Sequence, residues 1–250
     1  MATHEVAIAR PRSGLGSGPV PDRIWYAAYG SNTDPERLHC YLTGTRPAGA
    51  VHRPPGTGRG AGAPAGCRDR TPPARSIALV LPGLLYFATE SVVWTGGRAF
   101  YDPATSAELP VRAYLLTRSQ FSDIAAQEMY RPAGTDLDLS EAVRTGRSHL
   151  GPGRYETLVC PGVFDGLPIL TWTAPWRWRE IGGNPPAAAY LGRIGTGLRA
   201  AHRWPVSETA GYLASRPGAA GHWTSAAVAD LLRSEYNSLG RQSGVDRCTC

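Results

Sequence analysis

The 250-residue sequence contains no lysine, so each of its 26 basic residues is an arginine. A formal net charge of +6 at pH 7 makes nucleic acid the first class of partner to consider. A nucleic-acid-binding protein is expected to gather its basic residues on one face or in one run, whereas these arginines are scattered along the chain. We therefore expect no nucleic-acid partner, and we attribute the arginine bias to the codon usage of a GC-rich genome.

Long apolar runs are also missing. The longest, residues 77–88, is interrupted by Pro82-Gly83 and is too short to cross a bilayer. Residues 1–22 place arginines among Gly, Ser and Pro without an apolar centre, which does not fit a secretory signal. These features predict a disordered leader, a cytoplasmic location and no membrane partner.

Motifs for several kinds of hydrolase are absent. The six histidines have no metal-ligand spacing, and neither His-Glu-x-x-His nor a Gly-x-Ser-x-Gly elbow occurs. The odd count of five cysteines favours reduced thiols. A Cys nucleophile stays possible, although Cys40 is expected to pack on a helix and Cys160 to lie in a strand without a base. The terminal Cys-Thr-Cys could bind a soft metal or form a redox pair, but a frayed end explains it better. We expect no metal and no other cofactor.

Hydrophobic periodicity and turn residues divide the chain into short elements. Strands are predicted at 24–29, 77–88 and 111–116, with a hairpin over 153–173 that turns at Asp165-Gly166, and helices at 34–44, 119–130, 186–202, 206–213 and 224–236. The helix over 186–202 contains Gly195 and Gly197, which are expected to break it. Strands and helices without regular βαβ alternation predict an α+β fold.

The same pattern predicts the domain organisation. Residues 1–22 form the leader, 23–215 one folded domain, and 216–250 a C-terminal helix with a flexible tail. Within the domain, residues 44–74 are dominated by Arg, Pro and Gly and form a long loop, mobile at least between 54 and 66. Arg68-Asp69 in this loop either belongs to a lid over a pocket or makes a surface salt bridge.

The stretch WYAAYGSNTDPERL (residues 25–38) ends an apolar run in Gly30-Ser31-Asn32 and then starts a helix. Asp34 is expected to cap this helix, Pro35 to occupy its first position, and Gly44 to end it. A turn of this kind can present several backbone N–H groups in one concavity, which suits a carboxylate or a developing oxyanion. It can equally be an ordinary strand-to-helix turn.

Glu128 is the residue that stands out among the carboxylates. It lies four residues after Ile124 and seven after Phe121, so helical spacing points it with them toward the core. Burial favours the neutral form of a carboxyl group, and a carboxyl that exchanges its proton near neutrality suits general acid–base catalysis. The alternative is that Glu128 bends out at the helix end or pairs with an arginine such as Arg131.

Several motifs, taken in order, resemble the gamma-glutamylcyclotransferase-like family, in a sequence of actinobacterial type. The Tyr-Gly-Ser-Asn (YGSN) hallmark stands in YAAYGSN (26–32), the aromatic/Gly-Gly segment in SVVWTGGRA (91–99), and the Gln-Glu pair in IAAQE (124–128). Tyr155 opens the next strand, and the Pro-x-x-x-Tyr helix with late glycines is PAAAYLGRIGTGL (186–198). The resemblance covers roughly residues 24–215.

This resemblance implies a small mixed β-barrel flanked by helices, with one pocket. It implies a metal-independent enzyme that cyclises a small-molecule γ-glutamyl substrate to 5-oxoproline and releases an amine or amino acid. It assigns the general acid/base to Glu128 and substrate binding to Tyr26, Tyr29, Gly30, Ser31, Asn32 and Tyr155. The same fold without turnover, as a small-molecule binding module, is the alternative.

Two residues depart from the family pattern. Thr33 stands where Leu or Met usually follows the Asn, and Trp172 stands where some members have a pocket Tyr. These changes bear on the shape of the pocket, so the substrate stays open. The sequence does not indicate an oligomeric state.

Overall fold

The computed structural model describes residues 7–8, 18–45 and 65–234. The strands are β1 (Ala7–Ile8), β2 (Arg23–Ala28), β3 (Arg75–Pro82), β4 (Leu84–Ala88), β5 (Arg98–Asp102), β6 (Glu108–Thr117), β7 (Arg147–His149), β8 (Thr157–Phe164) and β9 (Leu167–Thr173). The helices are α1 (Pro35–Thr43), α2 (Arg118–Glu128), α3 (Ser140–Thr145), α4 (Ala188–His202) and α5 (Val206–Ala214), together with a 3-10 helix at Ser31–Thr33 and a last helix over 225–234.

Seven of the strands form one mixed sheet in the order β1-β3-β6-β2-β9-β8-β7, and β4 and β5 pair separately. β2 runs antiparallel to β6 and parallel to β9. The predicted α+β class is confirmed. The described strands do not close into the expected barrel, because β1 and β7 lie at opposite edges of the sheet.

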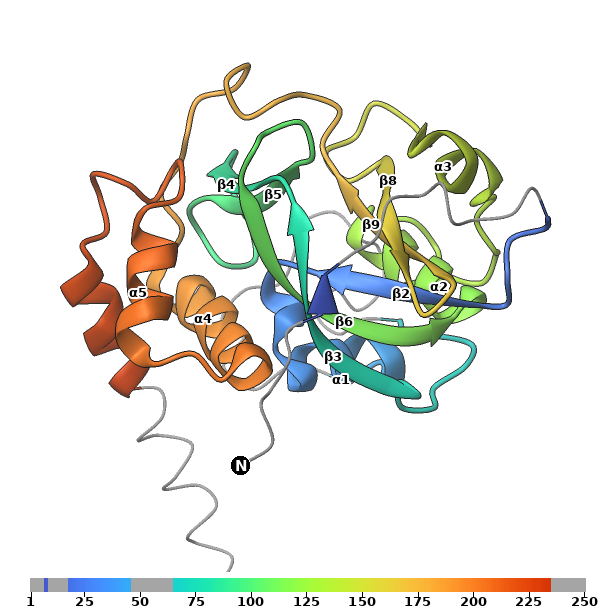
Figure 1. The fold of residues 1–250 in the computed structure, drawn as a ribbon, viewed down its shortest axis with the longest axis horizontal. Helices are drawn as coiled ribbons and strands as arrows, with labels where there is room; N and C mark the ends of the chain where they lie inside the picture. The colour runs from blue at the N-terminus through green and yellow to red at the C-terminus, as the bar shows by residue number, and fades with distance from the viewer. Residues whose placement is uncertain (1–6, 9–17, 46–64, 235–250) are drawn as a thin grey trace, which may run out of the picture.

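β2 lies near the middle of this sheet and is buried on both faces. Trp25 and Ala27 pack into one hydrophobic core, which includes residues of α4 and α5. Ile24, Tyr26 and Ala28 pack into the other, which includes residues of α1 and α2. Successive side chains of a strand point to opposite faces, so a strand buried on both faces requires packed structure on each side of the sheet. Figure 1 shows α4 and α5 beside the sheet at one end and α2 and α3 at the other.

The local signals around β2 and the hairpin are confirmed. Asp34 caps α1 by accepting a hydrogen bond from Glu36 N at 3.0 Å, and Gly44 ends the helix in the left-handed region at φ 80°. The hairpin turns at Asp165 and Gly166, both with positive φ, so that β8 pairs with β9. β8 begins at Thr157, two residues after Tyr155.

α4 runs unbroken through Gly195 and Gly197, so the predicted helix break was wrong. The two glycines instead allow close packing. A Cβ atom on Gly197 would lie 2.4 Å from the carbonyl carbon of Thr33, and one on Gly195 would lie 2.5 Å from Leu232. Tertiary contact therefore outweighs the low helix propensity of glycine here.

The ends of the chain contribute to the fold where they are described. Ala7–Ile8, within the expected disordered leader, pairs in parallel with β3. The helix over 225–234 places Val228 and Leu232 in the same core as α4, so residues 216–234 belong to the main structure. The other residues of the leader up to 17, those of the tail after 234 and the terminal Cys-Thr-Cys lie outside the described residues.

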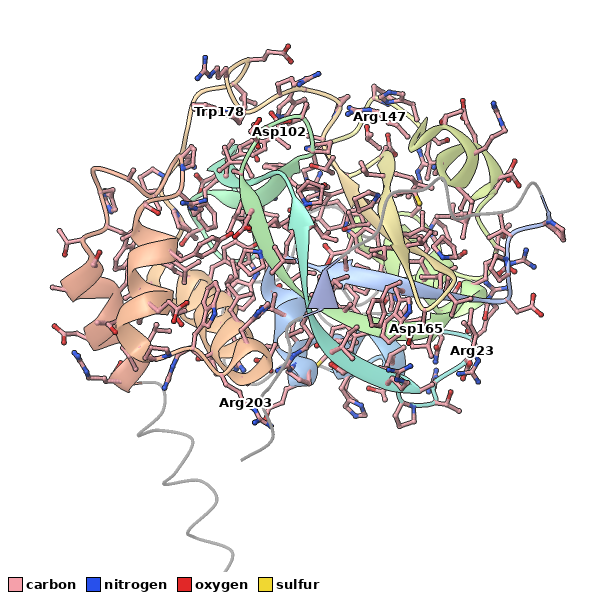
Figure 2. All side chains as sticks on the ribbon, viewed as in Figure 1. Arg23, Asp102, Arg147, Asp165, Trp178 and Arg203 are labelled. Atoms are coloured by element: carbon pink, nitrogen blue, oxygen red, sulfur yellow. The ribbon has the colours of Figure 1, made fainter. Side chains whose placement is uncertain are left out.

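The segment after β9 is held across the β4–β5 pair. Trp178 donates its backbone N–H to Asp102 Oδ2 at 3.2 Å, and Figure 2 shows the two residues beside each other at one edge of the molecule. Over the described ranges, none of the helices is both long enough and apolar enough to traverse a bilayer.

Candidate functional site

A cavity of about 80 Å³ opens where β2 ends. Its walls come from the end of β2 and the turn after it, from α1 and from the end of α2. They are completed by β5 and the segment before it, by the segment before β8, by β9 and by the start of α4. It is lined by Tyr26, Tyr29, Gly30, Ser31, Asn32, Arg37, Tyr41, Ser91, Val93, Trp94, Arg98, Ala99, Glu128, Tyr130, Arg154, Tyr155, Trp172 and Tyr190. The seven site residues predicted from the sequence therefore lie together around one cavity.

The turn from Gly30 to Thr33 is fixed by hydrogen bonds to its own backbone and to neighbouring elements. Thr33 N donates to Gly30 O at 3.0 Å, and Thr33 Oγ1 donates to Gly30 O at 2.9 Å and to Ile194 O of α4 at 3.3 Å. The Tyr114 hydroxyl donates to Asn32 O at 2.9 Å. A Cβ atom on Gly30 would lie 3.2 Å from the Tyr190 hydroxyl oxygen, so a larger residue there would require Tyr190 to shift by a few tenths of an ångström. The Thr33 departure from the family pattern thus ties the turn to α4.

Asn32 connects the turn to the predicted catalytic carboxylate. Its Nδ2 donates to Glu128 Oε1 and to the Tyr26 hydroxyl, each at 3.2 Å. Its Oδ1 is buried and has no hydrogen-bond partner. A buried acceptor without a donor is rare in folded proteins and points to a group supplied by a ligand.

Glu128 is the last residue of α2, where it is half-buried at the cavity wall rather than enclosed in the core. Phe121 and Ile124, from which its direction was inferred, are fully buried. Helical spacing identified the correct side of α2, but the helix ends at Glu128 and leaves the carboxylate open to the cavity. Burial, followed by the charge of this carboxylate, raises the pKa of the Tyr26 and Tyr41 hydroxyls well above their usual value.

The tyrosines of the cavity are largely bonded to backbone groups. Tyr29 donates its hydroxyl to Trp172 O at 2.6 Å, and Tyr155 donates to Ala99 O at 3.0 Å. Ala99 N in turn donates to the Tyr190 hydroxyl at 3.2 Å. Tyr29 and Tyr155 therefore shape the cavity and hold its walls together. Trp172, the second departure from the family pattern, stacks on Tyr26 with ring centroids 4.6 Å apart.

Three arginines that the sequence analysis did not single out also line the cavity: Arg37, Arg98 and Arg154, here called the arginine set. Arg37 donates to the Tyr41 hydroxyl at 3.2 Å and lies over that ring at 4.8 Å. Arg154 lies over Tyr130 at 4.4 Å. The sequence signal for these residues is weak, since arginine is the sole basic residue of the chain and occurs throughout it.

Arg68-Asp69, predicted to form either a lid or a salt bridge, lies outside the cavity lining. Arg68 bonds the fully buried Asp123 at 3.0 Å and also pairs with Asp136, while Asp69 accepts a hydrogen bond from Thr71. These two residues therefore fasten the end of the long loop to α2, and the ion-pair alternative is the one that the structure supports.

The three described cysteines, Cys40, Cys67 and Cys160, are buried free thiols. Burial raises the pKa of the Cys67 thiol to about 12, which favours the unreactive thiol form. Within the described ranges, no three His, Cys, Asp or Glu side chains are grouped so that they could hold a metal ion.

Comparison with known proteins gives limited similarity. No family model matches the chain. The chain is 29% identical over 208 residues to histone deacetylase 5 of Arabidopsis thaliana, a match that covers 76% of this chain and 30% of that protein. The matched part thus spans less than a third of the length of this curated relative.

Two solved structures align with most of the chain. One is an uncharacterized human protein, loc79017, with 17% identity and a TM-score of 0.44, and the other is a gamma-glutamyl cyclotransferase with 16% identity and a TM-score of 0.41. Each alignment covers 85% of this chain and 99% of the other. At these TM-scores the likeness does not establish a common fold.

Proposed function

We propose that the protein is a gamma-glutamylcyclotransferase-type enzyme. It cyclises a γ-glutamyl amide to 5-oxoproline and releases an amine or amino acid, with Glu128 as general acid/base. The observation that carries this proposal is the contact between Asn32 and Glu128 in a cavity that also contains the turn after β2. The resemblance of the ordered motifs to the gamma-glutamylcyclotransferase-like family supplies the reaction.

The nucleophile of this reaction is the α-amino group of the substrate itself, so the protein needs to position it and to take its proton. The Asn32 amide orients the Glu128 carboxylate, and the unpartnered Asn32 Oδ1 is available to accept a hydrogen bond from the α-ammonium group. Arg37 lies in the same cavity and suits the α-carboxylate, because a guanidinium group binds carboxylates through paired N–H donors. The substrate's amino-acid end is thereby held between opposite charges.

Chemistry then follows in two steps. Glu128 removes a proton from the α-ammonium group, and the freed amine forms a C–N bond to the γ-carbonyl carbon, giving a tetrahedral oxyanion. N–H groups of the turn after β2 are candidates to bind this oxyanion. The original amide C–N bond breaks as Glu128 returns the proton to the leaving nitrogen. The ring nitrogen then gives its second proton to the Glu128 carboxylate, which passes it to the released amine, leaving neutral 5-oxoproline lactam and an ammonium product. Holding amine and carbonyl in contact lowers the activation barrier by several kcal/mol at most, because the substrate already carries both groups and part of the orientation gain of about 7–11 kcal/mol is present without the protein.

The deacetylase activity named for the plant relative is not proposed for this chain. The match covers 30% of that protein, and the described part of the chain offers no group of three side chains suited to a metal ion.

The proposal is tested by the release of 5-oxoproline, measured by mass spectrometry, from a panel of γ-glutamyl amino acids and amines. Glu128→Gln keeps the shape of the side chain but removes the acid/base, so the release rate should fall by roughly 10²–10⁴. Glu208→Gln, an exposed change on α5, is the matched control and should retain wild-type activity. Equal turnover by wild type and Glu128→Gln would contradict the assignment. Binding of the panel without turnover by either protein would favour a binding module.

A further inference from the structure

The charges that line the cavity are unbalanced. The arginine set contributes three guanidinium groups, and Glu128 is the one carboxylate in the lining. None of the three arginines forms an ion pair with an acidic side chain within the described ranges. With Glu128 ionised, the lining therefore carries a net charge of about plus two.

Glu90 is an acidic residue outside the cavity lining, and the charge of Arg98 acts on it. It accepts hydrogen bonds from Gly96 N and Asn184 Nδ2. These bonds, with a smaller contribution from the charge of Arg98, lower the pKa of Glu90. Arg98 itself donates to the Thr89 hydroxyl at 3.3 Å. Glu90 is thus engaged by neutral donors outside the cavity.

Two members of the arginine set have buried donors with nothing to bond. The Nε atoms of Arg37 and Arg154 are buried and lack a hydrogen-bond partner. Both guanidinium groups lie over aromatic rings: that of Arg37 is 5.7 Å from the Trp94 centroid, and that of Arg154 is 5.7 Å from the Tyr155 centroid. A ring face attracts a cation but leaves its N–H donors unsatisfied. Anionic ligand groups would balance the charge and offer acceptors to these guanidinium groups.

The arginine set divides between two parts of the cavity. Arg37 donates to the Tyr41 hydroxyl, whose pKa is raised by burial and then by the charge of Glu128 and a hydrogen bond with it, so Arg37 belongs with the acid/base. Arg154 lies over the Tyr155 ring, and the Tyr155 hydroxyl donates to Ala99 O, the residue next to Arg98. Arg98 and Arg154 therefore share the Tyr155 side.

We propose that the amine released by this enzyme is a dicarboxylic amino acid, whose two carboxylates bind Arg98 and Arg154. This inference rests on the proposed function, which places the α-carboxylate at Arg37 and the α-ammonium group at Glu128. A γ-glutamyl conjugate of a dicarboxylic amino acid carries three carboxylates and one ammonium group. Its net charge of minus two balances the lining, whereas the conjugate of a simple alkylamine is neutral and leaves two arginines unpaired in the cavity.

The test compares kcat/KM for 5-oxoproline release from four conjugates: γ-glutamylpropylamine, γ-glutamylalanine, γ-glutamylglutamate and γ-glutamyl-2-aminoethylphosphonate. Each carboxylate that binds an arginine should raise kcat/KM on the order of tenfold, so γ-glutamylglutamate is expected to be the best substrate. A higher kcat/KM for the phosphonate conjugate than for γ-glutamylglutamate would indicate a site for one dianionic group instead of two carboxylates, and would overturn the assignment.

Variants then link this preference to the named residues. In Arg98→Gln and Arg154→Gln, the ratio of kcat/KM for γ-glutamylglutamate to that for γ-glutamylpropylamine, which carries neither carboxylate, should fall by about tenfold, and Arg154→Lys should recover part of it. A ratio measured within one protein does not depend on how much of it is folded. Arg75→Gln removes the same charge from an exposed pair with Asp165 outside the cavity and should leave the ratio unchanged.

Two negative results have different meanings. Release from γ-glutamylalanine or γ-glutamylpropylamine at least as efficient as from γ-glutamylglutamate would overturn this inference and leave the proposed function standing. No 5-oxoproline from any of the four conjugates would overturn both.

Discussion

The turn after β2 and the arginine set line the same cavity, but they are bound to the rest of the molecule in different ways. Thr33 of the turn is fully buried and bonds both its own turn and α4, and Tyr114 holds Asn32 from β6. Apart from Asn32 Oδ1, the bonds described for the turn are made within the fold, whereas Arg37 and Arg154 of the arginine set keep buried donors that the described part of the fold does not bond.

This contrast separates two consequences of mutation. Residues whose bonds are all within the protein should lose stability and activity together when changed. Residues with unsatisfied groups facing a cavity should lose activity while stability is kept or raised, because their donors are costly in the absence of a ligand. Asn32 combines both cases, since its Nδ2 is bonded and its Oδ1 is not.

The largest combined effect is expected at Gly197, where α4 meets the turn. A Cβ atom there would lie 2.4 Å from both the carbonyl carbon and Oγ1 of Thr33, and the backbone cannot move away without displacing the turn. Gly197→Ala should lower the free energy of unfolding by about 1–3 kcal/mol or more through overpacking and should abolish most of the activity. Urea unfolding and 5-oxoproline release measure the two losses.

Gly211 provides the matched control, because it lies in α5 with no atom within 4 Å of its Cβ position. Gly211→Ala should be neutral or stabilising by up to about 1 kcal/mol, from helix propensity alone. If Gly197→Ala behaved like Gly211→Ala, the turn would not depend on its contact with α4.

A smaller effect, and one restricted to activity, is expected at Arg37. Arg37→Met keeps the apolar stem but removes the guanidinium group, including its unpartnered Nε. We expect kcat/KM for 5-oxoproline release to fall about 10- to 100-fold, since a charged hydrogen bond contributes about 1.5–3 kcal/mol. The free energy of unfolding should stay within about 0.5 kcal/mol of wild type or increase. A large loss of stability would show that Arg37 belongs with the turn rather than with the arginine set.

The turn could be predicted from the sequence because its signals are local. Gly30 at a strand end, Asp34 as a helix cap and Gly44 as a helix stop lie within one short stretch, and each has a backbone reason to be there. Helical spacing likewise placed Glu128 on the correct side of α2. Its position at the last residue of the helix, which opens it to the cavity, depends on where α2 ends.

The arginine set and the role of the α4 glycines are not local. Arg37, Arg98 and Arg154 come from α1, from β5 and from the segment before β8, and only the tertiary fold brings them together. Nothing in spacing distinguishes them from the other arginines of a chain without lysine. Gly195 and Gly197 were wrongly predicted to break the helix because propensity describes an isolated helix, while their contacts lie on other elements.

The smallest effect is expected at Cys67, whose buried thiol contacts the backbone of Tyr41. Its Sγ donates to Tyr41 O at 3.4 Å, and burial raises the thiol pKa from about 9 to about 12. A native pKa above the unfolded value means that the neutral thiol stabilises the fold below pH 9 and that this contribution is lost as the pH rises toward 12.

The difference in unfolding free energy between wild type and Cys67→Ala should therefore fall by roughly 1 kcal/mol from pH 8 to pH 10, measured by urea unfolding at each pH. The buried tyrosines titrate in both proteins, so their contribution cancels in this difference. A difference that does not change with pH would mean that the thiol ionises equally well in the folded and unfolded chains. The Cys67 thiol would then not stabilise the backbone of Tyr41.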